Sequence, residues 1–96
     1  MRWKVVGMMT KACGMIETLG LANSILVADV MLKTANVCLV GQKEVSQAYY
    51  TIVIEGEVSA VQLAIEKGVK VAQDASVLLA FDVIPGPVED TKKLLT

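Results

Sequence analysis

Histidine is absent from this 96-residue chain, and with it the commonest general base and metal ligand of proteins. The chain also lacks a GxSxG turn, a phosphate-binding glycine loop with lysine, and the cysteine spacing of a zinc site. A small enzyme would have to use Glu17, Asp29 or Lys33. No motif supports such chemistry, so we expect no enzyme, no cofactor and no metal site.

An excess of charge of one sign is also missing, because nine basic and ten acidic residues are scattered along the chain. Without a basic patch, little is available to hold the phosphates of a nucleic acid. No apolar run reaches the roughly eighteen residues of a membrane span, and Asp29 interrupts the longest one. The N-terminus is too short and too polar for a signal peptide. The sequence therefore predicts a cytoplasmic protein that binds neither nucleic acid nor membrane.

Cysteine is scarce, and the two residues, Cys13 and Cys38, lie inside apolar runs without CxxC spacing. This placement predicts reduced core residues. Apolar side chains, in contrast, are abundant: 54% of the residues are hydrophobic. A single domain of this size buries only about 60–65% of its unfolded surface when it folds alone. Composition therefore favours one small domain whose surplus apolar surface contacts partner subunits.

Hydrophobic periodicity predicts a strand, a helix and a second strand in each half of the chain. The first helix is expected over residues 19–34, with Leu21, Ile25, Ala28 and Leu32 on one apolar face. The second helix is expected over residues 57–73, and its apolar face contains small and branched residues. These are Val61, Ala64, Ile65, Gly68 and Ala72.

The expected strands surround these helices, and they cover residues 12–17, 37–41, 49–55 and 77–83. Residues 43–48 are polar and predict a loop, and residues 88–95 can form a short terminal helix. Two such halves give a ferredoxin-like α/β (α+β) sandwich, with a mainly antiparallel four-stranded sheet and helices on one face.

Four short segments occur in a fixed order along the chain. They are residues 14–20 (GMIETLG), 33–41 (KTANVCLVG), 55–58 (EGEV) and 83–87 (VIPGP). Through this order and its ungapped spacing, the chain resembles the single-domain, hexamer-forming shell proteins of bacterial microcompartments (BMC). The resemblance implies a BMC shell domain over residues 12–96, with a fold of the kind described above. Residues 1–11 form an N-terminal extension, for which we expect an added edge strand.

The resemblance implies a structural protein of a microcompartment shell in the cytoplasm. Such a protein forms cyclic hexamers, packs beside other shell proteins and lets small polar metabolites through a central pore. An alternative reading of the same fold is a small-molecule-binding regulatory module that forms a dimer or trimer. The mass in solution distinguishes the two hypotheses.

Three positions correspond to the family's hexamer edge: two match its residues and one departs from them. Lys33 matches the edge lysine, although by itself it predicts only a helix pair with Asp29, worth about 0.2–0.5 kcal/mol. Asn36 matches an asparagine near that lysine, and it is also typical of a helix end in a left-handed conformation. Gly86 stands where the family usually carries arginine, and its lack of donors predicts poor tiling into flat sheets.

Ser46, Gln47 and Ala48 stand at the position of the family's pore loop, and they depart from its typical Gly-X-Gly stretch. The residues alone indicate only an ordinary polar loop. Because non-glycine residues lose roughly 1 kcal/mol for each forced positive φ, we expect this loop to take another path. Six Gln47 amides would then line the opening and favour neutral or weakly polar solutes.

Overall fold

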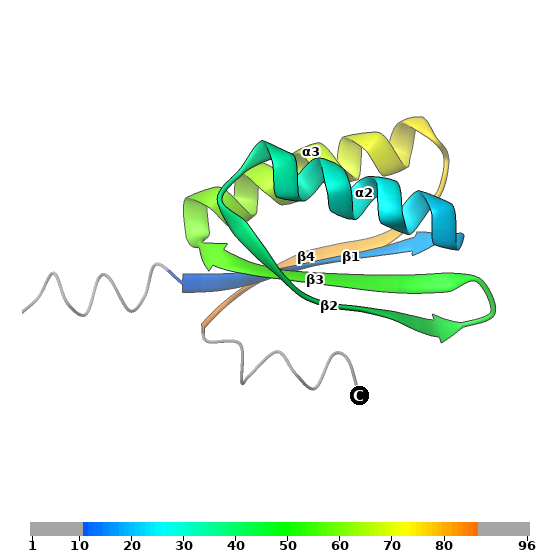
Figure 1. Ribbon diagram of the computed structural model, residues 1–96, viewed down its shortest axis with the longest axis horizontal. Helices are drawn as coiled ribbons and strands as arrows, with labels where there is room; N and C mark the ends of the chain where they lie inside the picture. Colours follow the sequence, from blue (N-terminus) through cyan, green and yellow to red (C-terminus); the bar gives the residue numbers. More distant parts are fainter. Residues whose placement is uncertain (1–10, 87–96) are drawn as a thin grey trace, which may run out of the picture.

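The computed structural model describes residues 11–86, in which two helices cover one face of a four-stranded sheet (Figure 1). The strand order is β2-β3-β1-β4, and each neighbouring pair is antiparallel. The elements are β1 (Lys11–Leu19), α2 (Leu21–Thr34), β2 (Val37–Ser46), β3 (Tyr49–Glu57), α3 (Val58–Asp74) and β4 (Leu78–Pro85). The predicted fold class is confirmed. The strand expected in the N-terminal extension and the helix expected over residues 88–95 lie outside the described residues.

The hydrophobic core lies between the sheet and the helices. Ile16 of β1 is fully buried opposite Ile52 of β3, and Ile54 is buried two residues further along the same strand. Alternate residues of a strand point to one face, so these three side chains meet the helices above them. The predicted apolar face of the second helix is confirmed, because Val61, Ala64, Ile65, Gly68 and Ala72 are its buried residues.

The predicted apolar face of the first helix is wrong, except at Ala28. The buried residues of α2 are Ser24, Val27, Ala28 and Met31. The predicted Leu21, Ile25 and Leu32 are instead 52%, 54% and 41% exposed. Apolar residues surround most of α2, so their spacing did not identify the face that meets the sheet.

A polar residue decides the orientation of α2. The buried hydroxyl of Ser24 donates to the carbonyl of Leu21 at 2.8 Å and accepts from Nε2 of Gln42 at 2.6 Å. The Ser24 hydroxyl thus has partners both as a donor and as an acceptor, as buried polar groups generally do. This contact joins α2 to β2 and turns the leucine side of the helix outward.

The strand β2 is longer than the sequence predicts, since it continues through residues 43–46, which were expected to form a loop. It is an edge strand, and Lys43 and Glu44 pair with β3 while their side chains stay exposed. Such a segment lacks the alternation of apolar and polar residues on which the prediction depended. Its edge position also explains Cys38, which is exposed rather than in the core, whereas Cys13 is buried as expected.

The helix α3 approaches β1 closely at Gly14. A Cβ atom built at Gly14 would lie 2.7 Å from Cγ1 and Cδ1 of Ile65 and 2.8 Å from Cγ1 of Val61. Real Cβ atoms almost never come so close to another heavy atom. The absence of a side chain at this position therefore sets the distance between α3 and the sheet.

We expect Gly14→Ala to lower the free energy of unfolding by about 1–3 kcal/mol, because the added methyl overpacks the core. Backbone preference alone predicts the opposite sign, a gain of about 0.5–1 kcal/mol for alanine in a strand. Chemical denaturation at fixed protein concentration measures the difference. Adding Ile65→Val, which removes the nearby Cδ1, should restore part of the loss, and a stabilised Gly14→Ala variant would contradict the packing argument.

Candidate pore turn and edge residues

The β2–β3 turn contains the three predicted pore residues. Ser46 is the last residue of β2, and Gln47 and Ala48 form the turn before Tyr49 begins β3. All three are exposed. The hairpin reaches out at the end of the sheet where α2 begins, as Figure 1 shows at the right of the view. The turn is thus available to neighbours at one extremity of the described chain.

Ala48 adopts a left-handed backbone conformation, with φ of 64°. The expectation that this segment would avoid positive φ is therefore wrong. Two hydrogen bonds hold the conformation. The N–H of Gly20 donates to the carbonyl of Ala48 at 2.6 Å, and the N–H of Ala48 donates to Oε2 of Glu44 at 3.4 Å. The first bond fixes the turn to the start of α2 and offsets the backbone cost of Ala48.

Apolar and uncharged polar side chains surround the turn, together with the Glu44 carboxylate that accepts from Ala48. Leu19, Val45 and Tyr49 are 40%, 54% and 41% exposed, and Leu19 and Ser46 both pair with Tyr49 in adjacent strands. Gln47 adds an amide that can donate and accept hydrogen bonds without carrying charge. This surface can bind neutral polar groups beside apolar ones.

We expect Ala48→Gly to raise the free energy of unfolding by about 0.5 kcal/mol. Relief of the left-handed alanine is worth about 1–2 kcal/mol and exceeds the added entropy of the unfolded chain, about 0.4–1 kcal/mol. Ser46→Gly is the matched control: Ser46 ends a strand without positive φ, so this change should destabilise by about 0.5–1 kcal/mol. Denaturation curves that shift in the same direction for both variants would rule out the backbone argument.

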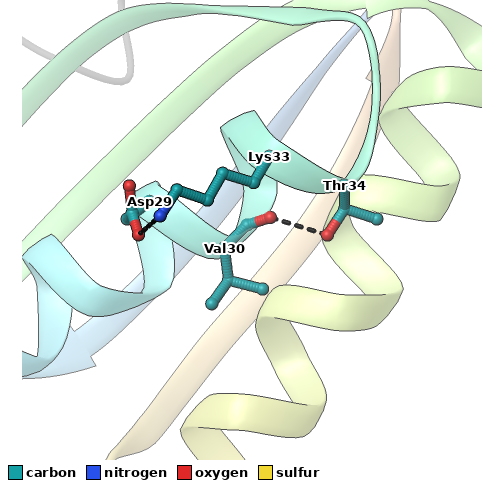
Figure 2. A network of polar contacts seen from close by, with 4 residues as sticks. All are labelled: Asp29, Val30, Lys33 and Thr34. Carbon is teal, nitrogen blue, oxygen red and sulfur yellow. Dashed lines mark hydrogen bonds and ion pairs between the residues drawn. The ribbon is translucent and has the colours of Figure 1, made fainter.

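Lys33 lies in the last turn of α2, at the end far from the hairpin. Its Nζ is 3.1 Å from Oδ2 of Asp29, which confirms the predicted pair (Figure 2). The Lys33 side chain is 76% exposed, so the pair contributes little to stability. Nearby, Oγ1 of Thr34 donates to the carbonyl of Val30, four residues earlier in the helix, at 2.6 Å. Lys33 therefore remains available to a neighbouring molecule.

Asn36 is exposed between α2 and β2. It does not take the left-handed conformation expected of it, because the non-glycine residues with positive φ among residues 11–86 are Ala48 and Ser76. The helix instead ends at Ala35 in an extended conformation, with φ of −146°. The chain passes directly from there into β2, so no left-handed residue is needed.

Gly86 directly follows β4, and its N–H donates to the carbonyl of Lys11 at 3.1 Å. Its φ is 120°, a value that L side chains rarely adopt. Strand pairing places Gly86 and Asn36 at the same end of the sheet but on opposite edges, three strand spacings or about 14 Å apart. Lys33, Asn36 and Gly86 thus share the end opposite the hairpin.

A groove between α3 and β4 was not predicted from the sequence. Its volume is about 520 Å³, and Ile65, Val69, Phe81 and Val83 supply its apolar lining. Phe81, on the edge strand β4, is 53% exposed, and the sequence analysis did not single it out. Within residues 11–86, no three His, Cys, Asp or Glu side chains form a group suited to a metal ion. No helix in the same range is long and apolar enough to cross a membrane.

Comparisons with known proteins agree on one family. The model of the BMC domain matches residues 12–87. The microcompartment shell protein PduA of Citrobacter freundii is 40% identical over 88 residues, which cover 92% of this chain and 95% of PduA. The shell protein EutM of Escherichia coli K12 is 38% identical over 84 residues, 88% of this chain and 87% of EutM.

A solved structure has the same fold. The crystal structure of a microcompartment protein from Desulfitobacterium hafniense superposes with a TM-score of 0.74 at 34% identity. The match covers 80% of this chain and 42% of that one.

Proposed function

This chain belongs to the BMC domain family, and from that premise we propose that it forms a cyclic hexamer around a central pore in a microcompartment shell. The relatives are shell proteins, which are structural, so the prediction that the chain is not an enzyme is confirmed. The observation that carries the proposal is the family match over residues 12–87, together with the exposed hairpin turn at one end of the fold.

The arrangement of the predicted sites supports a ring. If the β2–β3 turn lies at the axis, then Ser46, Gln47 and Ala48 line the pore. Lys33, Asn36 and Gly86 then lie on the rim, because they occupy the opposite end of the sheet. A rim position suits contacts with other shell proteins of the same compartment. The hairpin end would then line the path of the solutes, and the opposite end would contact neighbouring shell proteins.

The solutes that pass would be small and polar. The turn offers amide and hydroxyl groups without charge, and the exposed Lys43 and Glu44 behind it carry opposite signs. Such a pore discriminates little by charge. The shell would stand in the cytoplasm, where the compartments of the related proteins are found.

A regulatory module that binds a small molecule is the second candidate. The observation in its favour is the α3–β4 groove, whose volume of about 520 Å³ would accept a small ligand. That function predicts a dimer or trimer and saturable binding. A ring predicts neither, so the assembly state separates the two proposals.

We expect native mass spectrometry at micromolar concentration to show a species of six times the 10.3 kDa chain mass. The reason is the exposed apolar surface of so small a domain, which obligate interfaces bury in areas of about 2,000 Å² or more. A folded monomer or dimer that persists at high concentration would contradict the hexamer and favour the regulatory module.

The lateral assembly should be limited by Gly86. We expect the unmodified protein to form extended sheets poorly and Gly86→Arg to form them more readily, because arginine supplies five donors at the rim. Gly86→Ala is the matched control, since it brings the same backbone strain at φ 120° without the guanidinium group. Electron microscopy of the three proteins measures the difference. Broad sheets from the unmodified protein, or equal behaviour of both variants, would rule out this role of Gly86.

A further inference from the structure

Two side chains beside the β2–β3 turn, Leu19 and Tyr49, form an exposed pair on the sheet face opposite the helices. Leu19 ends β1 and Tyr49 begins β3, and the two residues are partners in the antiparallel ladder. Their exposed fractions are 40% and 41%. We call this pair the turn collar, because it adjoins the turn that holds the predicted pore residues.

The direction of both side chains follows from the alternation of faces along a strand. Ile16 faces the helices, because a Cβ atom at Gly68 of α3 would lie 2.6 Å from its Cδ1. Leu19 lies three residues beyond Ile16 on β1. An odd spacing reverses the face, so Leu19 points away from the helices. Tyr49 points the same way, because directly opposite residues in a ladder share one face of the sheet.

The exposure of this face on β3 drops sharply beyond the collar. Thr51 and Val53, the next two residues of β3 on the same face, are 3% and 0% exposed. Tyr50, the other tyrosine of the chain, faces the helices instead. A small molecule that approaches the turn from the side opposite the helices therefore meets the aromatic ring of Tyr49 and the apolar side chain of Leu19.

We propose that the turn collar is a solute-binding site at one mouth of the pore, and that it favours molecules which join an apolar part to a hydroxyl group. The proposal rests on the proposed ring with the turn at its axis. Six collars would then surround the mouth that lies opposite the helices. Each collar supplies an aromatic ring, a phenolic hydroxyl that can donate and accept, and apolar surface beside them.

The collar is close enough to the turn for the six copies to act together. Consecutive Cα atoms are about 3.8 Å apart, so the Cα of Tyr49 lies within about 8 Å of the Cα of Gln47. In a six-membered ring, equivalent atoms of adjacent subunits are separated by their distance from the axis. With the turn at the axis, neighbouring collars therefore lie within reach of one small solute.

The chemistry of the collar separates two kinds of uncharged solute. Burial of apolar surface stabilises a bound hydrocarbon part, and a tyrosine ring adds the preferred contacts between aromatic groups. A polyol such as glycerol has little apolar surface to bury, and hydrogen bonds to the collar only replace those it makes with water. The collar therefore narrows the range of polar solutes that the turn itself would accept.

Fluorine NMR tests this site, because the chain contains two tyrosines, Tyr49 and Tyr50. The full chain is labelled with fluorotyrosine, and its mass is first measured by native mass spectrometry. Labelled Tyr50→Phe retains one signal, which identifies that of Tyr49. Benzyl alcohol is the test solute and glycerol is its polar control. We expect benzyl alcohol to shift the Tyr49 signal in a saturable way and to leave the Tyr50 signal unchanged, and glycerol to shift neither.

Saturation-transfer NMR then compares the affinity for benzyl alcohol among unlabelled variants. Tyr49→Ser should weaken binding about two- to tenfold, which corresponds to the loss of one aromatic contact, and Leu19→Ser should also weaken it. Tyr50→Phe and Leu63→Ser are the matched controls. Tyr50 faces the helices, and Leu63 of α3 is 42% exposed, almost as Leu19 is. Neither control should change the affinity.

The outcomes separate the collar from the ring. In an intact hexamer, a Tyr49 signal that does not respond to benzyl alcohol, or that responds equally to glycerol, would overturn the collar and leave the ring in place. Unchanged affinity in Tyr49→Ser hexamers would overturn the collar as well. The fluorine measurement uses the unmodified sequence, so it decides the question even if Tyr49→Ser does not assemble. The absence of a hexamer from the unmodified protein would overturn both proposals.

Discussion

The close approach of α3 to the central strand β1 is the constraint on which the rest of the structure depends. Gly14 has no side chain where Ile65 packs, and Gly68 has none where Ile16 packs, so that a Cβ at either glycine would lie 2.6–2.7 Å from its neighbour. The two glycines let α3 settle directly on the sheet. The two helices therefore cover the centre of one face of the sheet. Near the edge strands β2 and β4, apolar side chains stay exposed in the described chain.

The same packing makes the two ends of the molecule chemically different. At one end, Gly20 begins α2 and holds the carbonyl of Ala48, so helix and hairpin are joined where the turn reaches outward. At the other end, the helix stops at Ala35 and the strands finish beside Lys33 and Gly86. Two ends that differ in this way suit a member of a ring, because equivalent turns can meet at an axis while the opposite ends face other rings.

Sequence reasoning succeeded where burial dictates the pattern. The apolar face of α3 was predicted residue by residue because its other side is polar, whereas α2 is apolar on several sides and its face depends on the hydrogen bond between Ser24 and Gln42. The length of β2 was missed because an exposed edge strand has no hydrophobic period. The pore and edge residues were placed only by resemblance, and the conformation of Ala48 needed a partner, Gly20, that lies 28 residues away in the chain.

The conformation of the turn also determines which group can select solutes. A glycine-flanked turn can present backbone amides to an axis, because glycine accepts positive φ freely. Here the N–H of Ala48 is directed to Glu44 and its carbonyl accepts from Gly20, so both backbone groups of this residue are already used. The side chains of Ser46 and Gln47 are the exposed polar groups of the three predicted pore residues. If the tip lies at a pore, its width and polarity therefore follow from the rotamers of these two side chains rather than from the backbone of Ala48.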